Sequence, residues 1–305
     1  LMGYVPRDMR TDDRMKTRVV LLVILGIGVL AAAAIGHSRL DRSPSEPSLP
    51  AGRLTVAVSF YPLAEFARNV GGETVQVHQI APTGVDVHDV QLSPQQIVTI
   101  QAADVFLYNG GGIEPWAERL HAEAERQGVR VVNMFTALGF EQESGSSQAN
   151  ARAPGDVNPH LWLDIVLAQR QVEAIRDAFI AADPQQAVLY REQAVRYLAR
   201  LSDLDRRFRD GLSSCQSRKV MTAHDAFRRL TERYNLTLTP LAGLTPEHEP
   251  RPRQLAELVR FARAKGIRTI FSETLVSSRI TESFARQIGA DIQALHPLEG
   301  LTSEE

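Results

Sequence analysis

The sequence predicts an α/β protein with two pseudo-symmetric lobes, each a roughly four-stranded parallel sheet flanked by helices, joined by one long rigid helix. Apolar residues recur at three- and four-residue steps along one face of a helical run from Asp183 to Leu212. Short apolar segments alternate with amphipathic ones before this run, and the alternation repeats after it. We therefore divide the chain into an N-terminal segment (1–53), a first lobe (54–182), the linking helix (183–212) and a second lobe (213–305).

The N-terminal segment is typical of an export signal or membrane anchor followed by a linker. Val19–Ile35 reads VVLLVILGIGVLAAAAI, without a charge, and follows a basic region. Cleavage at the small residues Ala32–Ala34 would make it a signal peptide, whereas an uncleaved segment would be a transmembrane helix. Serine and proline dominate 37–52, which indicates a tether. Both alternatives predict an extracytoplasmic location, in the periplasm or on the outer face of the cytoplasmic membrane.

Charge and cysteine content restrict the possible partners and covalent links. The formal net charge is −2 and the signs are interspersed, so the chain lacks the basic field that nucleic-acid binding requires. Cys215 is the one cysteine of the sequence, which rules out an intramolecular disulfide. We expect Cys215 to be a buried structural thiol.

In the first lobe, each predicted strand is followed by a helix or a loop, as in a parallel sheet with helices on its faces. Ser93-Pro94 supplies a helix cap and a first-turn proline, and Gly71-Gly72 ends the preceding helix. The polar stretch from Gln142 to Asn158 predicts an exposed loop. The strands are expected at 54–60, 75–80, 104–109 and 129–133, and the helices at 61–70, 93–103, 114–127 and 161–182.

The linking helix and the second lobe complete the pattern. Asp183-Pro184 is expected to cap the helix and Gly211 to stop it, which gives a length of roughly 40 Å at 1.5 Å per residue. The two halves show no residue-level identity, so the repeat is one of architecture. In the second lobe we expect strands at 219–223, 236–240, 269–272 and 290–295, and helices at 224–234, 253–265 and 278–288.

Three histidines stand where ligands gather in open α/β sheets, beyond the carboxyl ends of strands. His88 lies on the loop after the second strand, His160 follows a later loop, and His224 directly ends the first strand of the second lobe. Neutral imidazole is the commonest metal ligand, and three imidazoles from separate loops would suit Zn²⁺. The alternative is three partly buried, hydrogen-bonded histidines without a metal.

Seven motifs, in order along the chain, carry a resemblance to a known family: SFYPLAEFARNVGGETVQV, PTGVDVHDVQLSP, ADVFLYNGGGIEPW, NPHLWLD, TAHDAFRRLTERYNL, TPEHEPRPRQL and TIFSET. From Leu54 to Leu301 the chain resembles the zinc and manganese solute-binding proteins of ABC transporters, cluster A-I. The resemblance implies a monomeric receptor, not an enzyme, that binds a metal ion between its lobes and delivers it to an ABC-transporter permease at the cytoplasmic membrane.

Carried over by motif, the resemblance makes His88 and His160 the metal ligands of the first lobe and His224 the first ligand of the second. Manganese-selective members usually have a carboxylate at the position of His224, so we expect Zn²⁺, with Mn²⁺ as the alternative. Glu299 is the predicted fourth ligand, although His296 or water could take that position and Glu299 could instead be exposed. Glu273 would either orient a ligand imidazole or cap a helix or form a salt bridge.

The sequence differs from this family in two places, and three other functions are alternatives to zinc capture. Residues 142–158 contain no histidine, so an accessory metal-gathering loop is absent, and Arg229 replaces the aromatic residue usually found after the third histidine. A manganese or mixed Mn/Zn/Fe receptor and a metal-dependent cell-adhesion protein share the fold. A zinc hydrolase would also use three histidines, but it needs a general acid or base beside the bound water, and no HExxH motif occurs.

Overall fold

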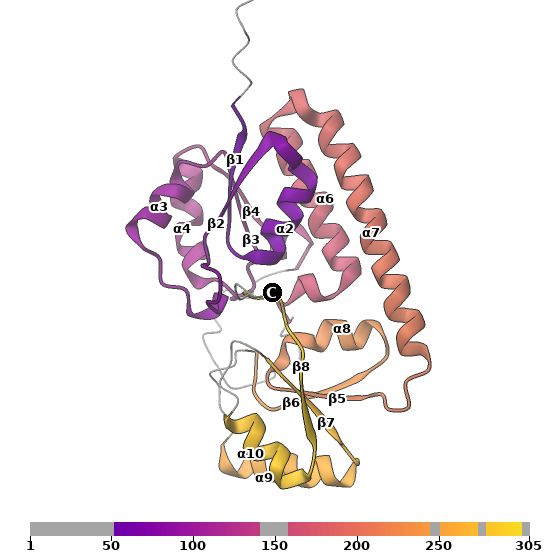
Figure 1. The fold of residues 1–305 in the computed structure, drawn as a ribbon. Helices are drawn as coiled ribbons and strands as arrows, with labels where there is room; N and C mark the ends of the chain where they lie inside the picture. Colours follow the sequence, from indigo (N-terminus) through magenta and orange to yellow (C-terminus); the bar gives the residue numbers. More distant parts are fainter. Residues whose placement is uncertain (1–51, 141–157, 245–250, 274–278, 301–305) are drawn as a thin grey trace, which may run out of the picture. The chain divides into compact units, whose positions relative to one another are not determined.

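The computed structural model describes residues 52–140, 158–244, 251–273 and 279–300 (Figure 1). The chain divides into two compact units, Leu1–Gly52 and Arg53–Glu305, and both sheets belong to the second. The predicted signal or anchor, the tether up to residue 51, and positions 142–157 of the predicted polar loop lie outside the described residues. Within the described ranges, no helix combines the length and the apolar character needed to cross a membrane.

The first sheet contains four parallel strands in the order β2-β1-β3-β4, as the sequence predicts. The strands are β1 (Leu54–Val58), β2 (Val75–Gln79), β3 (Val105–Tyr108) and β4 (Arg130–Asn133). The helices of this lobe are α2 (Tyr61–Gly71), α3 (Pro94–Gln101), α4 (Pro115–Arg126), the short α5 (Met134–Ala137) and α6 (Ile165–Ala182). β1 and β3 are almost wholly buried, because parallel sheets carry helices on both faces.

The second sheet has the order β6-β5-β7-β8, again parallel. The first strand of each half therefore holds the same place in its sheet, which confirms the predicted pseudo-symmetry. The strands are β5 (Lys219–Thr222), β6 (Thr237–Pro240), β7 (Thr269–Ser272) and β8 (Asp291–Ala294). The helices are α8 (Arg228–Arg233), α9 (Pro252–Ala264) and α10 (Arg279–Ile288).

The linking helix, α7 (Ala187–Ser213), has 27 residues, which gives a length of about 40 Å at 1.5 Å per residue. Figure 1 shows it as one continuous helix. Its apolar face packs against α2 and α6 of the first lobe. Toward its C-terminal end it reaches the second lobe, where Phe208 stacks on Tyr234 with ring centroids 5.3 Å apart and Asp205 accepts a hydrogen bond from the Tyr234 hydroxyl at 2.9 Å. One continuous helix thus contacts both lobes.

Two predicted helix starts differ from the structure, and the differences concern the candidate ligands. The helix expected from Leu161 begins as a 3₁₀ turn, and α6 starts after Asp164, whose side chain caps it by accepting from Val166 N at 2.9 Å. His224 is likewise followed by a 3₁₀ turn, Asp225–Phe227, before α8. His160 and His224 therefore stand on turns ahead of their helices.

The start of the linking helix and the state of Cys215 also differ from expectation. Asp183 makes no side-chain cap; its carboxylate accepts from the Tyr190 hydroxyl at 3.2 Å, and a 3₁₀ turn, Pro184–Gln186, precedes α7. The prediction of a buried thiol is wrong, because Cys215 is exposed. It lies in the turn between α7 and β5, after the last residue of α7 that packs against the core.

Candidate metal site

Each candidate ligand lies beyond a strand end, on a segment that the fold holds in place. His88 lies in a 3₁₀ turn, Val87–Asp89. Asp86 caps this turn, because its Oδ1 accepts a hydrogen bond from His88 N at 2.9 Å. His160 precedes the 3₁₀ turn that leads into α6. His224 follows β5 and Glu299 follows β8. The carboxyl ends of the strands in both sheets thus supply the candidate residues, as expected for open parallel sheets.

The structure brings His88, His160, His224 and Glu299 into one cluster. One donor atom from each residue lies within 4.8 Å of the donor atoms of the other three. The His160 and His224 side chains are fully buried, Glu299 is 2 % exposed, and His88 is half-buried. The alternative of an exposed Glu299 is therefore wrong. His296, the competing candidate, is not in this group; its Nδ1 accepts a hydrogen bond from Leu298 N at 2.8 Å.

The donor atoms of the cluster are buried polar atoms without hydrogen-bond partners among the described residues. They are Nε2 of each of the three histidines and Oε1 of Glu299. The Glu299 Oε1 atom lies 3.1 Å from His160 Nε2 and 3.7 Å from His224 Nε2. Burying unpaired polar atoms is costly, so four at one point indicate a place built for a further bonding partner.

The other ring nitrogen of each buried histidine is occupied. His224 Nδ1 lies 2.7 Å from Glu273 Oε1, and the same oxygen accepts from His224 N at 3.3 Å. This contact fits both an acceptor that orients an imidazole and, when His224 is protonated, a salt bridge. His160 Nδ1 lies 2.9 Å from Asn158 Oδ1. Both imidazoles therefore direct Nε2 into the cluster.

Burial and neighbouring charges shift the pKa values in this cluster. Burial lowers the pKa of His160 to about 4, against the opposing attraction of Glu299. Burial also acts to lower the pKa of His224, but its hydrogen bond with Glu273 and its attraction to Glu299 outweigh that effect and raise it to about 10. Burial acts to raise the pKa of Glu299, yet its contacts with His160 and His224 lower it overall. Glu299 is thus ionised and His160 neutral near neutral pH, the forms that bind metals.

Polar contacts close to the cluster connect the two lobes, and the sequence reasoning missed them. Trp162 Nε1 donates to Pro297 O at 2.7 Å, two residues before Glu299. Asp164, the cap of α6, forms a bidentate ion pair with Arg233 of α8 at 2.6 and 2.8 Å. Trp162 and Asp164 lie in the motif NPHLWLD and Arg233 lies in TAHDAFRRLTERYNL, but a sequence offers no sign of which side chains meet.

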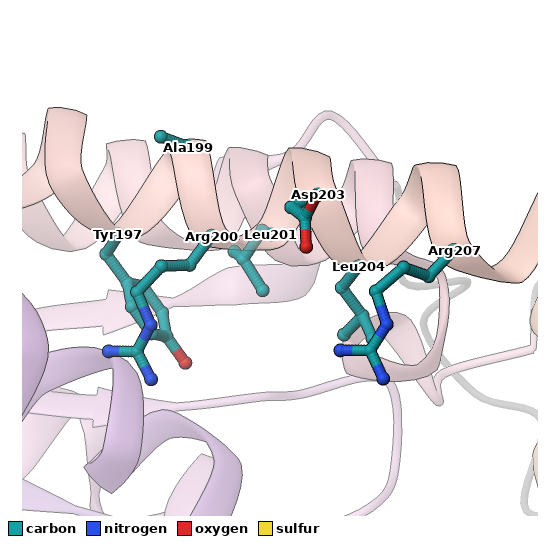
Figure 2. Close-up of a pocket in the computed structure, with 7 residues that line it drawn as sticks. All are labelled: Tyr197, Ala199, Arg200, Leu201, Asp203, Leu204 and Arg207. Atoms are coloured by element: carbon teal, nitrogen blue, oxygen red, sulfur yellow. The ribbon is translucent and has the colours of Figure 1, made fainter.

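A separate pocket of about 580 Å³ lies along α7 and shares no residue with the cluster. In Figure 2 the side chains of Arg200 and Arg207 extend from the same side of the helix, with Leu201 and Leu204 between them. The Arg200 guanidinium donates to Asn69 Oδ1 at 3.1 Å. The pocket brings together none of the candidate ligands and none of the groups around them.

The chain is similar to known proteins over most of its length. Residues 56–305 match the family model described as ZnuA, zinc-uptake complex component A, periplasmic. The chain is 31% identical over 291 residues to the high-affinity zinc uptake system protein ZnuA of Bacillus subtilis, covering 93% of this chain and 90% of that protein.

Solved structures extend the comparison. The mutant laminin-binding adhesin Lmb of Streptococcus agalactiae superposes with a TM-score of 0.74 at 28% identity, covering 82% of this chain and 92% of that one. The Zn(II)-bound ZnuA-like domain of Streptococcus pneumoniae AdcA gives a TM-score of 0.68 at 30% identity, covering 83% and 91%. This chain spans 52% of the length of the zinc-binding lipoprotein AdcA from the same species.

Proposed function

The chain belongs to the ZnuA family of periplasmic zinc-uptake components, and we propose that it captures Zn²⁺ outside the cytoplasm and delivers it to an ABC-transporter permease. The metal is the cargo of this protein. The proposed ligands are His88, His160, His224 and Glu299. Capture is an exchange of ligands, in which three imidazoles and one carboxylate replace the hydration shell of the ion.

The observation that carries the proposal is the convergence of four buried donor atoms without hydrogen-bond partners among the described residues. A tetrahedral zinc ion with bonds of 2.0–2.2 Å holds its donors roughly 3.4 Å apart. The donors here lie within 4.8 Å, so small side-chain adjustments would bring them to that spacing. An ion in this position would supply the bonding partner that each atom lacks.

The chemistry of the donors supports zinc over manganese. Imidazole nitrogen suits Zn²⁺, whereas Mn²⁺ favours carboxylate, carbonyl and water oxygens. Three nitrogens and a single oxygen therefore form a donor set of the zinc type, and the AdcA domain of similar fold was solved with Zn(II) bound.

The same four donor atoms favour a site that binds zinc over a catalytic site of a zinc hydrolase. Catalytic zinc sites combine three protein ligands with a water molecule in an open position. Here Glu299 offers a fourth protein donor, and Oε1 of the neighbouring Glu273 is engaged with His224.

Adhesion to laminin is a second candidate function, favoured by the similarity to Lmb. A solved structure of that protein is described as bifunctional, with adhesin and metal-transporting activity, and resembles this chain with a TM-score of 0.71 at 28% identity. Adhesion would use the outer surface and is compatible with zinc capture. Surface plasmon resonance on immobilised laminin, with and without Zn²⁺, tests it: absence of saturable binding rejects this function and leaves zinc capture untouched.

Native mass spectrometry of the full chain with Zn²⁺ and Mn²⁺ in competition tests the main proposal. We expect one zinc ion per chain, and at least 100-fold weaker zinc binding for His224→Ala and Glu299→Gln. His78→Ala, a histidine of β2 outside the cluster, is the matched control and should bind as the parent chain does. Unchanged stoichiometry and affinity in His224→Ala would reject the proposed site. A loss in His296→Ala with Glu299→Gln unaffected would transfer the fourth position to His296.

A further inference from the structure

Asn158 makes hydrogen bonds that fix the orientation of its side-chain amide. Oδ1 accepts from the backbone N–H of His160 at 3.0 Å, and Nδ2 donates to the backbone carbonyl of Asp225 at 2.6 Å. A backbone N–H can only donate and a carbonyl oxygen can only accept. The two partners therefore determine which end of the amide is the oxygen, without reference to the imidazole.

This orientation determines the tautomer of His160. Nδ1 of its ring lies 2.9 Å from Asn158 Oδ1, and that oxygen is an acceptor. Nδ1 must therefore carry the hydrogen, which leaves the lone pair of the neutral ring on Nε2. Nε2 is the atom that faces Glu299 in the cluster. The Asn158 amide thus presents the ring in the one neutral form that binds a metal through Nε2.

Asn158 also connects the His160 segment to the second lobe. Asp225, whose carbonyl accepts from Asn158 Nδ2, directly follows His224. The backbone carbonyl of Asn158 in turn accepts a hydrogen bond from Arg229 Nε, at the start of α8. Arg229 also lies over the ring of Phe140, 4.7 Å from its centroid. Asn158 is 6 % exposed, so water competes little for these bonds.

We propose that Asn158 is a positioning residue for the metal site, which presets the tautomer of His160 and sets its distance from His224 across the two lobes. The inference rests on the proposed function, because its purpose is to ready His160 for capture of the ion. The neutral amide does this without adding a charge beside His160. His224 is held by the carboxylate of Glu273 instead, so the two buried imidazoles are oriented by different chemistry.

Two substitutions separate the two tasks of Asn158. Asn158→Ala removes both the acceptor for His160 and the donor for Asp225. Asn158→Asp keeps an acceptor for Nδ1–H but places an oxygen against the carbonyl of Asp225, so it retains the first task and loses the second. Asn69→Ala, an asparagine on α2 whose side chain contacts Glu65 and Arg200, is the matched control.

The measurements are the tautomer of His160, read from long-range ¹H–¹⁵N correlations of its ring in the chelator-treated full chain, and the zinc dissociation constant, measured by competition with a chelator. The parent chain and Asn158→Asp should show the Nδ1–H form. Asn158→Ala should populate both tautomers and bind zinc 10- to 100-fold more weakly. Asn158→Asp should melt at a lower temperature than the parent without metal, because the bond to the second lobe is gone.

An Asn158→Ala chain that keeps a pure Nδ1–H signature and binds zinc within threefold of the parent would overturn the inference. If that variant does not fold, an Nε2–H signature in Asn158→Asp would overturn it equally. Failure of the proposed function looks different: the parent chain itself would then bind no zinc, while the tautomer of His160 could still be read.

Discussion

His224 Nδ1 lies 2.7 Å from Glu273 Oε1, and the two residues follow the adjacent parallel strands β5 and β7. The same oxygen accepts from the backbone N–H of His224. A carboxylate cannot donate, so Nδ1 carries a hydrogen and Nε2 faces the cluster. The places of the two residues after neighbouring strands therefore set the direction of a candidate ligand and, once its ring is neutral, its tautomer.

Glu273→Ala should weaken zinc binding by 10- to 100-fold, the usual cost of removing the acceptor behind a ligand histidine. Glu273→Gln keeps an acceptor oxygen but loses the charge, so we expect a smaller loss, below about tenfold. Chelator-competition titrations measure both constants. Equal losses in the two variants would show that the charge matters and the acceptor does not.

Zinc affinity should fall as the pH is lowered, because an imidazole must be neutral to bind the ion. Attraction by Glu273 and Glu299 raises the pKa of His224 to about 10, so at neutral pH an incoming ion displaces a proton from this residue. We expect proton release on binding, measured by calorimetry in buffers of different ionisation enthalpy. An affinity that stays constant from pH 7 to pH 5 would contradict this.

The buried carboxyl of Glu114 should make the protein less stable as the pH rises. Burial raises its pKa from 4.5 to about 7, against hydrogen bonds from Ser59, Asn109 N and Gly110 N. Between these values the folded chain holds a proton that the unfolded chain has released, so the free energy of unfolding declines from about pH 4.5 to pH 7 by at most roughly 3 kcal/mol. The change lies within that window and is complete above it.

Glu114→Gln should flatten this pH dependence, since the amide has no proton to release. Urea unfolding at pH 5 and pH 8, with chelator present, measures the difference for each chain. Glu123→Gln on α4, the helix that follows Glu114, is the control and should keep the parent's dependence, because Glu123 pairs with Arg126 and not with a histidine. The explanation fails if Glu114→Gln loses as much stability between the two pH values as the parent does.

The Asp164–Arg233 pair should stabilise the contact between the lobes. Asp164 caps α6 and meets Arg233 in a bidentate ion pair, with side-chain exposures of 10% and 32%. Asp164→Ser retains a capping oxygen and removes the pair, and Arg233→Gln removes it from the other side. A double-mutant cycle by urea unfolding should give a coupling free energy on the order of 1–2 kcal/mol, and a value near zero would mean that solvent screens the pair.

The two lobes should rotate little when metal binds, since α7 contacts both and a continuous helix resists bending. Small-angle scattering of the full chain with zinc and with chelator should give closely similar profiles, with any change confined to loops. A large change in the radius of gyration would show that α7 acts as a hinge.

The sequence by itself determined the elements and their order. Strand and helix patterns depend on neighbours a few residues apart, so period and capping residues were enough to predict two parallel sheets and the helix between them. Motif resemblance then selected His88, His160 and His224, although they are 72 and 64 residues apart along the chain, and left Glu299 as the predicted fourth ligand with His296 or water as alternatives. The sequence did not predict the precise residues at which the helices start. Local competition between side-chain and backbone hydrogen bonds decides the Asp164 cap and the 3₁₀ turn after His224.

Tertiary structure alone decided which groups face the candidate ligands. Glu299 meets His160 and His224 while His296, three residues earlier, does not, and no local pattern separates these two residues. The same holds for Asn158 and Asp225, which join the two lobes through one hydrogen bond. Burial is also a property of the tertiary structure, because only the packed interior removes water from the four donor atoms and leaves them without hydrogen-bond partners among the described residues. The exposure of Cys215 was also decided by the tertiary structure. Cysteine is a residue type that is usually buried, but this one follows the end of α7 and is exposed.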